Sequence, residues 1–246
     1  DDLEIFNIVL ITNMIVNSKS DYKVTKKSLY LVSTPIGNLE DITFRAVDIL
    51  KGVNLIAAED TRRSKILLSR YNIKTKMISY YEHNKFQRLL KIEEVLKDNY
   101  DVAVITDAGT PAISDPAYKL VRRAIEIGSK IEAIPGASAV LASLVSSGLP
   151  TDRFIFEGFL PPKKGRKKII ENLKDVEATI IFYENSNRLK RTVKQLFEIL
   201  GDRPAVICRE ITKIYEEIIR GTLSSLLEIL ETKTYKGECV LLVSKD

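Results

Sequence analysis

The sequence predicts an α/β protein of two domains, with a parallel sheet in the first and a mixed sheet in the second. From Leu29 to Ser147, short apolar runs alternate with helix-length amphipathic runs. This alternation is typical of a parallel sheet covered by helices on both faces. The segment Gly148-Leu149-Pro150-Thr151 interrupts it and is the best candidate for a linker. Beyond this segment, strands follow one another with fewer helices between them, which indicates a mixed sheet.

In the first domain, placed at residues 29–148, each predicted strand is a short apolar run that a turn ends. These strands are Leu29–Ser33, Asn54–Ala58, Met77–Tyr81, Val102–Thr106 and Ile131–Ile134. Between them, apolar residues recur at helical spacing. The predicted helices are Thr43–Leu50, Arg63–Tyr71, Lys85–Asp98, Ala117–Gly128 and Ser138–Ser147.

The second domain, residues 149–246, shows the same two patterns in a different order. Its predicted strands are Phe154–Leu160, Ala178–Tyr183, Ala205–Arg209, Glu216–Leu223 and Cys239–Ser244. Its predicted helices are Lys167–Leu173, Leu189–Leu200 and Ser224–Glu231. Two of the strands thus follow each other without a helix between them.

Composition narrows the class of protein. With 45% hydrophobic and 29% charged residues, the 246-residue chain is an ordinary folded protein, and its net charge of +5 modestly favours polyanionic partners. Two cysteines in apolar runs and a single histidine provide neither a disulfide framework nor a metal site. We therefore expect a cytoplasmic protein without a metal.

The first residues are a separate question. We treat residues 1–28 as an N-terminal extension, since Leu3–Val16 is apolar but too short and too often interrupted to span a membrane. The chain begins with Asp1, and Met14 precedes a polar stretch. Our hypothesis is that translation naturally starts at Met14, which intact-mass analysis of natively expressed protein would test.

Polar and small residues gather where four of the predicted strands end. The loops are Ser33–Asp41, Ala57–Arg62, Thr106–Pro111 and Pro135–Ala139. Each alone is explained by local structure: a turn at Pro35 and Gly37, a helix cap at Asp60 or Thr61, a positive φ at Gly109. In a parallel sheet these ends converge on one edge, where ligands bind. Together the loops favour a ligand crevice.

The chemistry of these loops narrows the ligand. The sequence has neither a G-x-G-x-x-G nor a Walker A motif, so a nucleotide-phosphate cradle is not indicated. The loops offer carboxylates, small hydroxyls and backbone groups instead. Those suit a cationic ligand with an adenosine part, and S-adenosylmethionine, with its sulfonium and ammonium groups, fits that description.

Several motifs occur in order along the chain from Leu29 to the C-terminus: Leu-Tyr-Leu-Val-Ser-Thr-Pro-Ile-Gly-Asn-Leu-Glu-Asp-Ile-Thr (29–43), Ala-Ala-Glu-Asp-Thr-Arg (57–62), Glu-His-Asn (82–84), Asp-Ala-Gly-Thr-Pro (107–111), Glu-Gly-Phe-Leu-Pro (157–161), Phe-Tyr-Glu (182–184) and Arg-Glu-Ile-Thr-Lys (209–213). With them the chain resembles the ribosomal RNA small subunit methyltransferase I family, within the tetrapyrrole methylase superfamily. The resemblance implies a tetrapyrrole-methylase-like fold of two α/β domains, with S-adenosylmethionine in the cleft between them. It also implies 2′-O-methylation of a cytidine ribose in the decoding region of small-subunit rRNA, by a homodimer.

Carried over by motif, the resemblance implies a set of cofactor contacts. They are Pro35, Ile36, Gly37, Asn38, Asp107, Ala108, Gly109, Thr110, Ser138, Ala139 and Tyr183. The chain departs from the superfamily in its first loop, where Thr-Pro-Ile-Gly-Asn replaces the usual glycine-rich sequence. Some family members also carry an extra C-terminal segment, whereas this chain stops at Lys245-Asp246, which leaves any RNA-docking role of that segment in doubt.

The acceptor hydroxyl is a poor nucleophile, so a nearby base would help the transfer. Candidates are Glu59, Asp60, Asp107 and His83, of which Asp60 is also a candidate helix cap.

RNA contacts are predicted in the basic run Pro161–Lys168, at Lys163, Lys164, Arg166 and Lys167, and at Arg62, with Arg63 as a further candidate. The alternative interpretation is the solvated start of a helix, which most runs of charged residues are.

Two other functions stay open at this point. One is methylation of a tetrapyrrole carbon or a protein residue by a relative of the same superfamily. The other is a non-catalytic RNA-binding or ribosome-assembly module.

Overall fold

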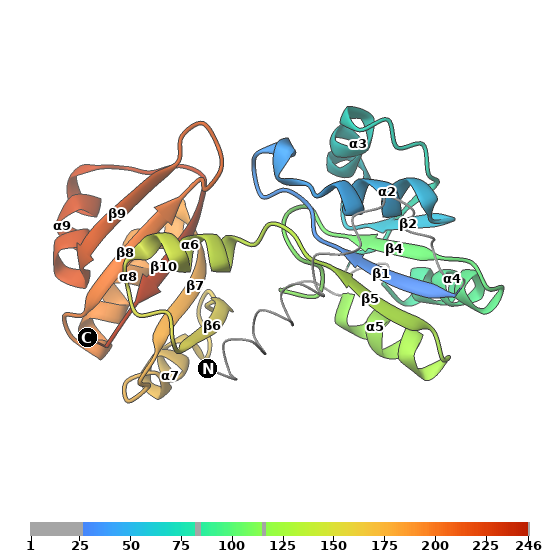
Figure 1. Cartoon of the computed structure of the whole chain (residues 1–246). Helices are drawn as coiled ribbons and strands as arrows, with labels where there is room; N and C mark the ends of the chain where they lie inside the picture. The colour runs from blue at the N-terminus through green and yellow to red at the C-terminus, as the bar shows by residue number, and fades with distance from the viewer. Residues whose placement is uncertain (1–26, 82–84, 115–116, 246) are drawn as a thin grey trace, which may run out of the picture.

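The computed structural model describes residues 27–81, 85–114 and 117–245. Two α/β units lie side by side, each built on its own five-stranded sheet (Figure 1). Within the described ranges, none of the helices is long and apolar enough to cross a membrane. His83 and the proposed start at Met14 fall outside these ranges.

The first sheet is entirely parallel, as predicted. Its strands are β1 (Ser28–Val32), β2 (Leu55–Ala58), β3 (Met77–Ser79), β4 (Val102–Ile105) and β5 (Lys130–Ile134), in the order β3-β2-β4-β1-β5. Every residue of β2 and β4 is buried, which is the pattern of strands covered on both faces.

Helices cover this sheet on both faces and bury two apolar clusters. They are η1 (Leu39–Asp41), α2 (Phe44–Gly52), α3 (Thr61–Arg70), α4 (Lys85–Lys97) and α5 (Ala117–Glu126). Ile49 of α2 and Leu68 of α3 belong to the cluster on one face, whereas Ile92 of α4 and Leu120 of α5 belong to the other. The short helix η1 was not predicted, because three residues carry no periodic pattern.

The second sheet is mixed, again as predicted. Its strands are β6 (Phe154–Phe159), β7 (Thr179–Asn185), β8 (Pro204–Arg209), β9 (Glu217–Thr222) and β10 (Glu238–Val243). They lie in the order β6-β7-β10-β8-β9, with β6 parallel to β7 and the other neighbours antiparallel. The helices α7 (Arg166–Asn172), α8 (Ser186–Leu200) and α9 (Leu223–Thr232) pack into one cluster on this sheet.

Helix α6 (Ala139–Ser147) packs on the second sheet, although it precedes the predicted linker. Its Val140 and Leu144 join the apolar cluster of β7, β8 and β10, and Figure 1 shows the helix in front of that sheet. The core of the second unit therefore begins before the boundary that we place at Gly148. The chain crosses between units through residues 135–138, next to the predicted ligand crevice.

Candidate functional site

A cavity of about 670 Å³ lies between the two units. The first unit contributes Glu59 after β2 and the loops that follow β1, β4 and β5. The second contributes the ends of β7 and β8 and the start of β10. The loops after parallel strands thus meet at one edge, as the sequence predicts.

Two of these loops are joined by hydrogen bonds into one wall. Thr34 and Gly109 exchange backbone hydrogen bonds of 2.9 and 3.0 Å, and the hydroxyls of Ser33 and Thr110 are 3.0 Å apart. Gly109 has φ of +81°, which an L side chain rarely adopts. Its role as a turn residue and its place in the cavity wall are therefore compatible.

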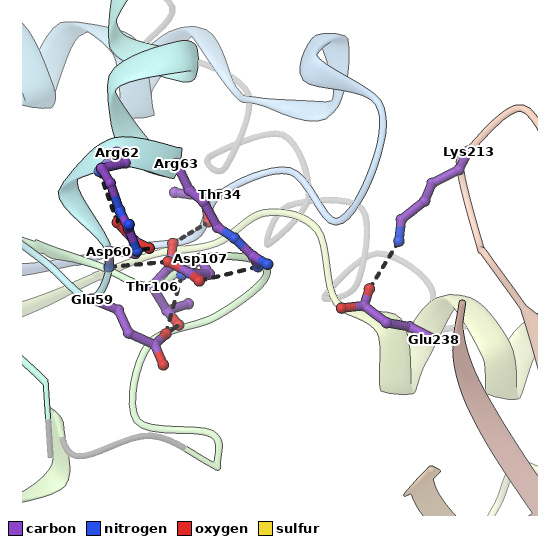
Figure 2. A network of polar contacts seen from close by, with 9 residues as sticks. All are labelled: Thr34, Glu59, Asp60, Arg62, Arg63, Thr106, Asp107, Lys213 and Glu238. Carbon is purple, nitrogen blue, oxygen red and sulfur yellow. Dashed lines mark hydrogen bonds and ion pairs between the residues drawn. The ribbon is translucent and has the colours of Figure 1, made fainter. Parts of the chain in front are cut away.

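An acidic network lies where this wall meets α3 (Figure 2). The amide of Asp60 donates to Oδ1 of Asp107 at 3.1 Å, and Arg63 donates to Oδ2 at 3.2 Å. On the other side, Glu59 Oε2 accepts from the Thr106 hydroxyl at 2.5 Å and from the Asp107 amide at 3.2 Å. Burial, and then the charge of Glu59, raise the pKa of Asp107 above its ordinary value.

Asp60 has a different environment from Asp107. Its carboxylate accepts hydrogen bonds from the side chain and the amide of Arg62, so Asp60 is the N-cap of α3. These hydrogen bonds lower the pKa of Asp60 to about 2. Asp60 lines neither this cavity nor a smaller cavity that adjoins it. The structure thus separates the candidate bases: Asp107 and Glu59 line the cavity, whereas Asp60 caps helix α3.

Tyr183 forms the facing wall, at the end of β7. Its ring packs against Phe156 and Phe159, with centroids 4.8 and 5.5 Å away. Burial raises the pKa of the Tyr183 hydroxyl, and the amide of Val140 opposes that shift. Tyr183 therefore ties the second sheet to the helix that enters from the first unit.

The loop that follows β8 was missed as part of the site. Lys213 lies 2.9 Å from both Glu210 and Glu238 and lines the cavity. Burial alone would lower the pKa of Lys213, but the two carboxylates outweigh it and raise the pKa, so the amine stays protonated. Lys213 is part of the motif Arg-Glu-Ile-Thr-Lys quoted above, but nothing in the sequence shows that this motif faces the cavity.

This loop also has an unusual backbone and a close contact with the first unit. Glu210 and Thr212 have φ of 50° and 65°, a region uncommon for residues other than glycine and costly for a β-branched one. Thr212 Oγ1 accepts from the Asn38 amide at 3.1 Å. A Cβ on Gly37 would come within 2.6 Å of that same hydroxyl, so only glycine fits there.

Most of the predicted cofactor residues line the large cavity. They are Ile36, Asp107, Ala108, Gly109, Thr110, Ser138, Ala139 and Tyr183. Pro35 and Gly37 instead line a second, adjoining cavity of about 370 Å³. Asn38 lines neither cavity and caps η1. Among the described residues, no group of His, Cys, Asp and Glu side chains is placed to hold a metal ion.

The predicted RNA contacts differ sharply in exposure. Lys163, Lys164 and Lys167 are exposed, and the side chain of Arg62 is 90% exposed beside Asp60.

The prediction that Arg166 binds RNA is wrong, because its side chain is only 4% exposed. Its guanidinium donates to Thr192 and Gln195, both at 2.6 Å, inside the second unit, and has no free face for a phosphate.

The fold thus consists of two α/β units, one with a parallel sheet and one with a mixed sheet, and a cavity lies between them. This architecture is that of a known family of proteins. Residues 28–227 match the family described as Tetrapyrrole (Corrin/Porphyrin) Methylases. The solved structure of a cobalt precorrin-4 methyltransferase has the same fold, with a TM-score of 0.68 at 19% identity, covering 89% of this chain and 95% of that one. The chain is therefore a member of the tetrapyrrole methylase family.

Sequence relatives define the branch more closely. The protein named ribosomal RNA small subunit methyltransferase I from Halalkalibacterium halodurans is 50% identical over 219 residues, which are 89% of this chain and 76% of that protein. Its namesake from Thermotoga maritima is 44% identical over 216 residues, 88% of this chain and 97% of that protein. The chain belongs to the ribosomal RNA small subunit methyltransferase I family.

Proposed function

We propose that this protein is an S-adenosylmethionine-dependent rRNA methyltransferase that modifies the ribose 2′-hydroxyl of a cytidine in the decoding region of small-subunit rRNA. The observation that carries the proposal is the large cavity, whose carboxylates Glu59, Asp107 and Glu210 stand beside apolar and aromatic walls. The names of the relatives support rRNA as the substrate.

The residues of the cavity fit S-adenosylmethionine. Carboxylates stabilise a sulfonium and an ammonium group, while Ile36, Leu141 and Tyr183 offer apolar surface to an adenosine. A Cβ on Gly136 would lie 2.9 Å from the Cβ of Ser33, so glycine allows the loop after β5 to pack closely on the loop after β1. We assign the cofactor to the residues that line this cavity. Of the predicted cofactor contacts, Pro35 and Gly37 line only the adjoining cavity and Asn38 lines neither.

When bound, S-adenosylmethionine supplies an activated methyl group: a bond forms from the acceptor oxygen to the methyl carbon, the carbon–sulfur bond leaves its electron pair on sulfur, and the hydroxyl proton departs. The protein has to align the reacting groups and receive that proton. Asp107 lines both cavities, and its raised pKa favours proton uptake relative to an ordinary aspartate. We assign it this role, with Glu59 holding its backbone in place.

RNA would be held by exposed cations near the cavity. Lys163, Lys164 and Lys167 follow β6, whose last residue, Phe159, lines the cavity, and Arg62 stands on α3. Such contacts bind phosphates without reading sequence. The cytoplasmic location, which we expect from the cysteine usage, and the homodimer, which the resemblance implies, both stay predictions.

The deciding experiment offers the protein methyl-labelled S-adenosylmethionine together with small ribosomal subunits, free rRNA, a tetrapyrrole or total protein. We expect label in the rRNA, recovered after nuclease digestion as 2′-O-methylcytidine. Label in the tetrapyrrole or in protein would assign the chain to another reaction of its superfamily. Binding of rRNA with no label anywhere would favour a non-catalytic assembly module.

A further inference from the structure

The second cavity, of about 370 Å³, adjoins the first and has its own set of walls. One wall is the loop after β1, with Pro35 and Gly37, and the other is α3, with Arg63, Ser64 and Leu67. The two cavities share Ile36, Thr106, Asp107, Ala108, Lys213 and Glu238. Ligands that occupied one cavity each would therefore meet at these shared residues, of which Asp107 is the proposed base.

The side-chain hydroxyl of Ser64 is buried and unpaired in the described part of the structure. The residue is 5% exposed, and its hydroxyl finds no hydrogen-bond partner among the residues that the structure describes. A buried hydroxyl left unpaired costs free energy, and rotation of the Ser64 side chain would bring it to a ligand in this cavity, which would supply the missing partner.

Arg63 supplies a cation at the mouth of the same cavity. Its side chain is 68% exposed and donates to Asp107 at 3.2 Å. Figure 2 shows its guanidinium extending past Asp107 toward the side of the site where Lys213 lies. Around it, Pro35, Ile66 and Leu67 give apolar surface. A cation, a free hydroxyl and apolar walls together match a ligand with a phosphate, a sugar and a base.

We propose that this smaller cavity holds the acceptor nucleotide of the RNA, with its phosphate at Arg63 and its ribose at the shared residues. The assignment rests on the proposed function and adds the place where the substrate binds. A single-stranded nucleotide turned out of its strand suits such a pocket. The hydroxyl of its ribose would then lie beside Asp107, which takes the proton.

The charges argue against assigning the smaller cavity to the cofactor. The larger cavity falls within the range of about 300 to 1,000 Å³ that small-molecule sites occupy, so it needs no extension. S-adenosylmethionine carries positive charge at its reacting end, and Arg63 would repel that charge. Arg63 would instead attract the phosphate of a nucleotide.

The test compares two cavity variants with two matched controls on the same helix. Arg63→Gln and Ser64→Leu alter the cavity, while Lys65→Gln and Ser69→Leu make the same kinds of change at exposed positions outside both cavities. For each protein we would measure thermal unfolding, the Kd for S-adenosylmethionine, and kcat and KM with small-subunit rRNA.

The two cavity variants are expected to raise the KM for rRNA about tenfold or more, without weakening S-adenosylmethionine binding, since a charged hydrogen bond and access to the pocket are lost. The controls are expected to stay within about twofold of wild type. If Ser64→Leu fails to fold, the KM values of Arg63→Gln and Ser64→Ala for rRNA still test the assignment of this cavity.

Two results would overturn the assignment. One is wild-type rRNA kinetics in the cavity variants, and the other is a loss of S-adenosylmethionine affinity, which would give the cavity to the cofactor. A wild-type protein that neither binds nor methylates rRNA would instead refute the proposed function itself, and with it the acceptor site.

Discussion

Thr34 and Gly109 are 75 residues apart in the chain, yet they exchange both of their backbone hydrogen bonds. This single bridge joins the loop after β1 to the loop after β4. The hydroxyl of Thr34 adds a bond to the carbonyl of Thr106 at 3.1 Å. The chain's own hydrogen bonds therefore hold this wall of the larger cavity in place, which would reduce the ordering cost of binding the proposed cofactor.

Replacing Gly109 by alanine tests this wall. The new Cβ would meet only Ile36 and Ala137 at ordinary distances of 3.5 and 3.8 Å, so the cost comes from the positive φ and amounts to about 1 kcal/mol. We expect a small drop in Tm and a several-fold weaker Kd for S-adenosylmethionine by calorimetry. Gly165→Ala is the matched control, since Gly165 has φ of +82° with open space around it and lines neither cavity. Equal loss of affinity in both variants would contradict the prediction.

Replacing Asp107 by asparagine should separate stability from activity. Because burial and Glu59 raise the pKa of Asp107, ionising this carboxyl costs folding free energy as the pH rises through its native pKa. The variant is therefore expected to be at least as stable as wild type at pH 7, with the difference shrinking as the pH falls toward the ordinary pKa of 3.8. Methylation should fall about a hundredfold or more, since Asp107 is the proposed proton acceptor. Melting curves across pH and initial rates measure the two effects. Full activity of the variant would exclude Asp107 as the base.

The sequence was informative about elements and less so about how they join. The run Val102–Ile105 is wholly apolar, and it forms a fully buried parallel strand as predicted. The apolar face of α6 was equally visible, but periodicity shows that a face is buried and not which sheet covers it. Val140 and Leu144 pack on the second sheet, so the units are joined earlier in the chain than composition indicates.

The same distinction applies to the site. Glycine, proline and acidic residues at strand ends were sufficient to predict one wall of the large cavity. Lys213 was not assigned, because its place opposite Gly37 depends on a contact between segments 174 residues apart. Arg166 was misassigned because a basic run shows how much charge a segment carries and not where each side chain points.

Tyr183 should contribute to cofactor binding mainly through its ring. We expect Tyr183→Ala to weaken S-adenosylmethionine binding about tenfold, equivalent to about 1.4 kcal/mol, because the aromatic wall formed with Phe156 and Phe159 is lost. The matched control is Tyr183→Phe, which keeps the ring contacts and removes only the hydroxyl. Calorimetric titration of both variants gives the comparison. Equal losses in the two variants would mean that the hydroxyl, not the ring, carries the affinity.

Arg166 is expected to act on stability. Its guanidinium is buried with Thr192, Gln195 and, at 3.8 Å, the fully buried carboxylate of Glu184. Removing it in Arg166→Ala takes its donor from Gln195 and one cation from Glu184, which keeps its contacts with Arg188 and Thr192. We expect this loss to cost about 2 kcal/mol. Urea unfolding measures this, with Lys168→Ala as the exposed neighbour that should change little. A variant as stable as wild type would show that the buried network does not need the guanidinium.

The exposed lysines of the same run are expected to show the opposite behaviour. Replacing Lys163, Lys164 and Lys167 by alanine removes three exposed cations without touching a core, so the Tm should stay close to that of wild type. If all three contact phosphates of single-stranded rRNA, the slope of log affinity against log salt should become shallower by about two, because fewer counterions are released. Fluorescence anisotropy at several salt concentrations measures that slope.

The control for this triple variant removes the same charge elsewhere. Lys51, Lys74 and Lys91 are exposed lysines of the first unit that line neither cavity. Their replacement lowers the net charge equally, so it reproduces any effect of overall charge but none of local contact. An identical change of slope in both triple variants would assign RNA binding to the net charge of the protein. A change confined to the first would locate the phosphate contacts at the loop after β6, beside the cavity that Phe159 lines.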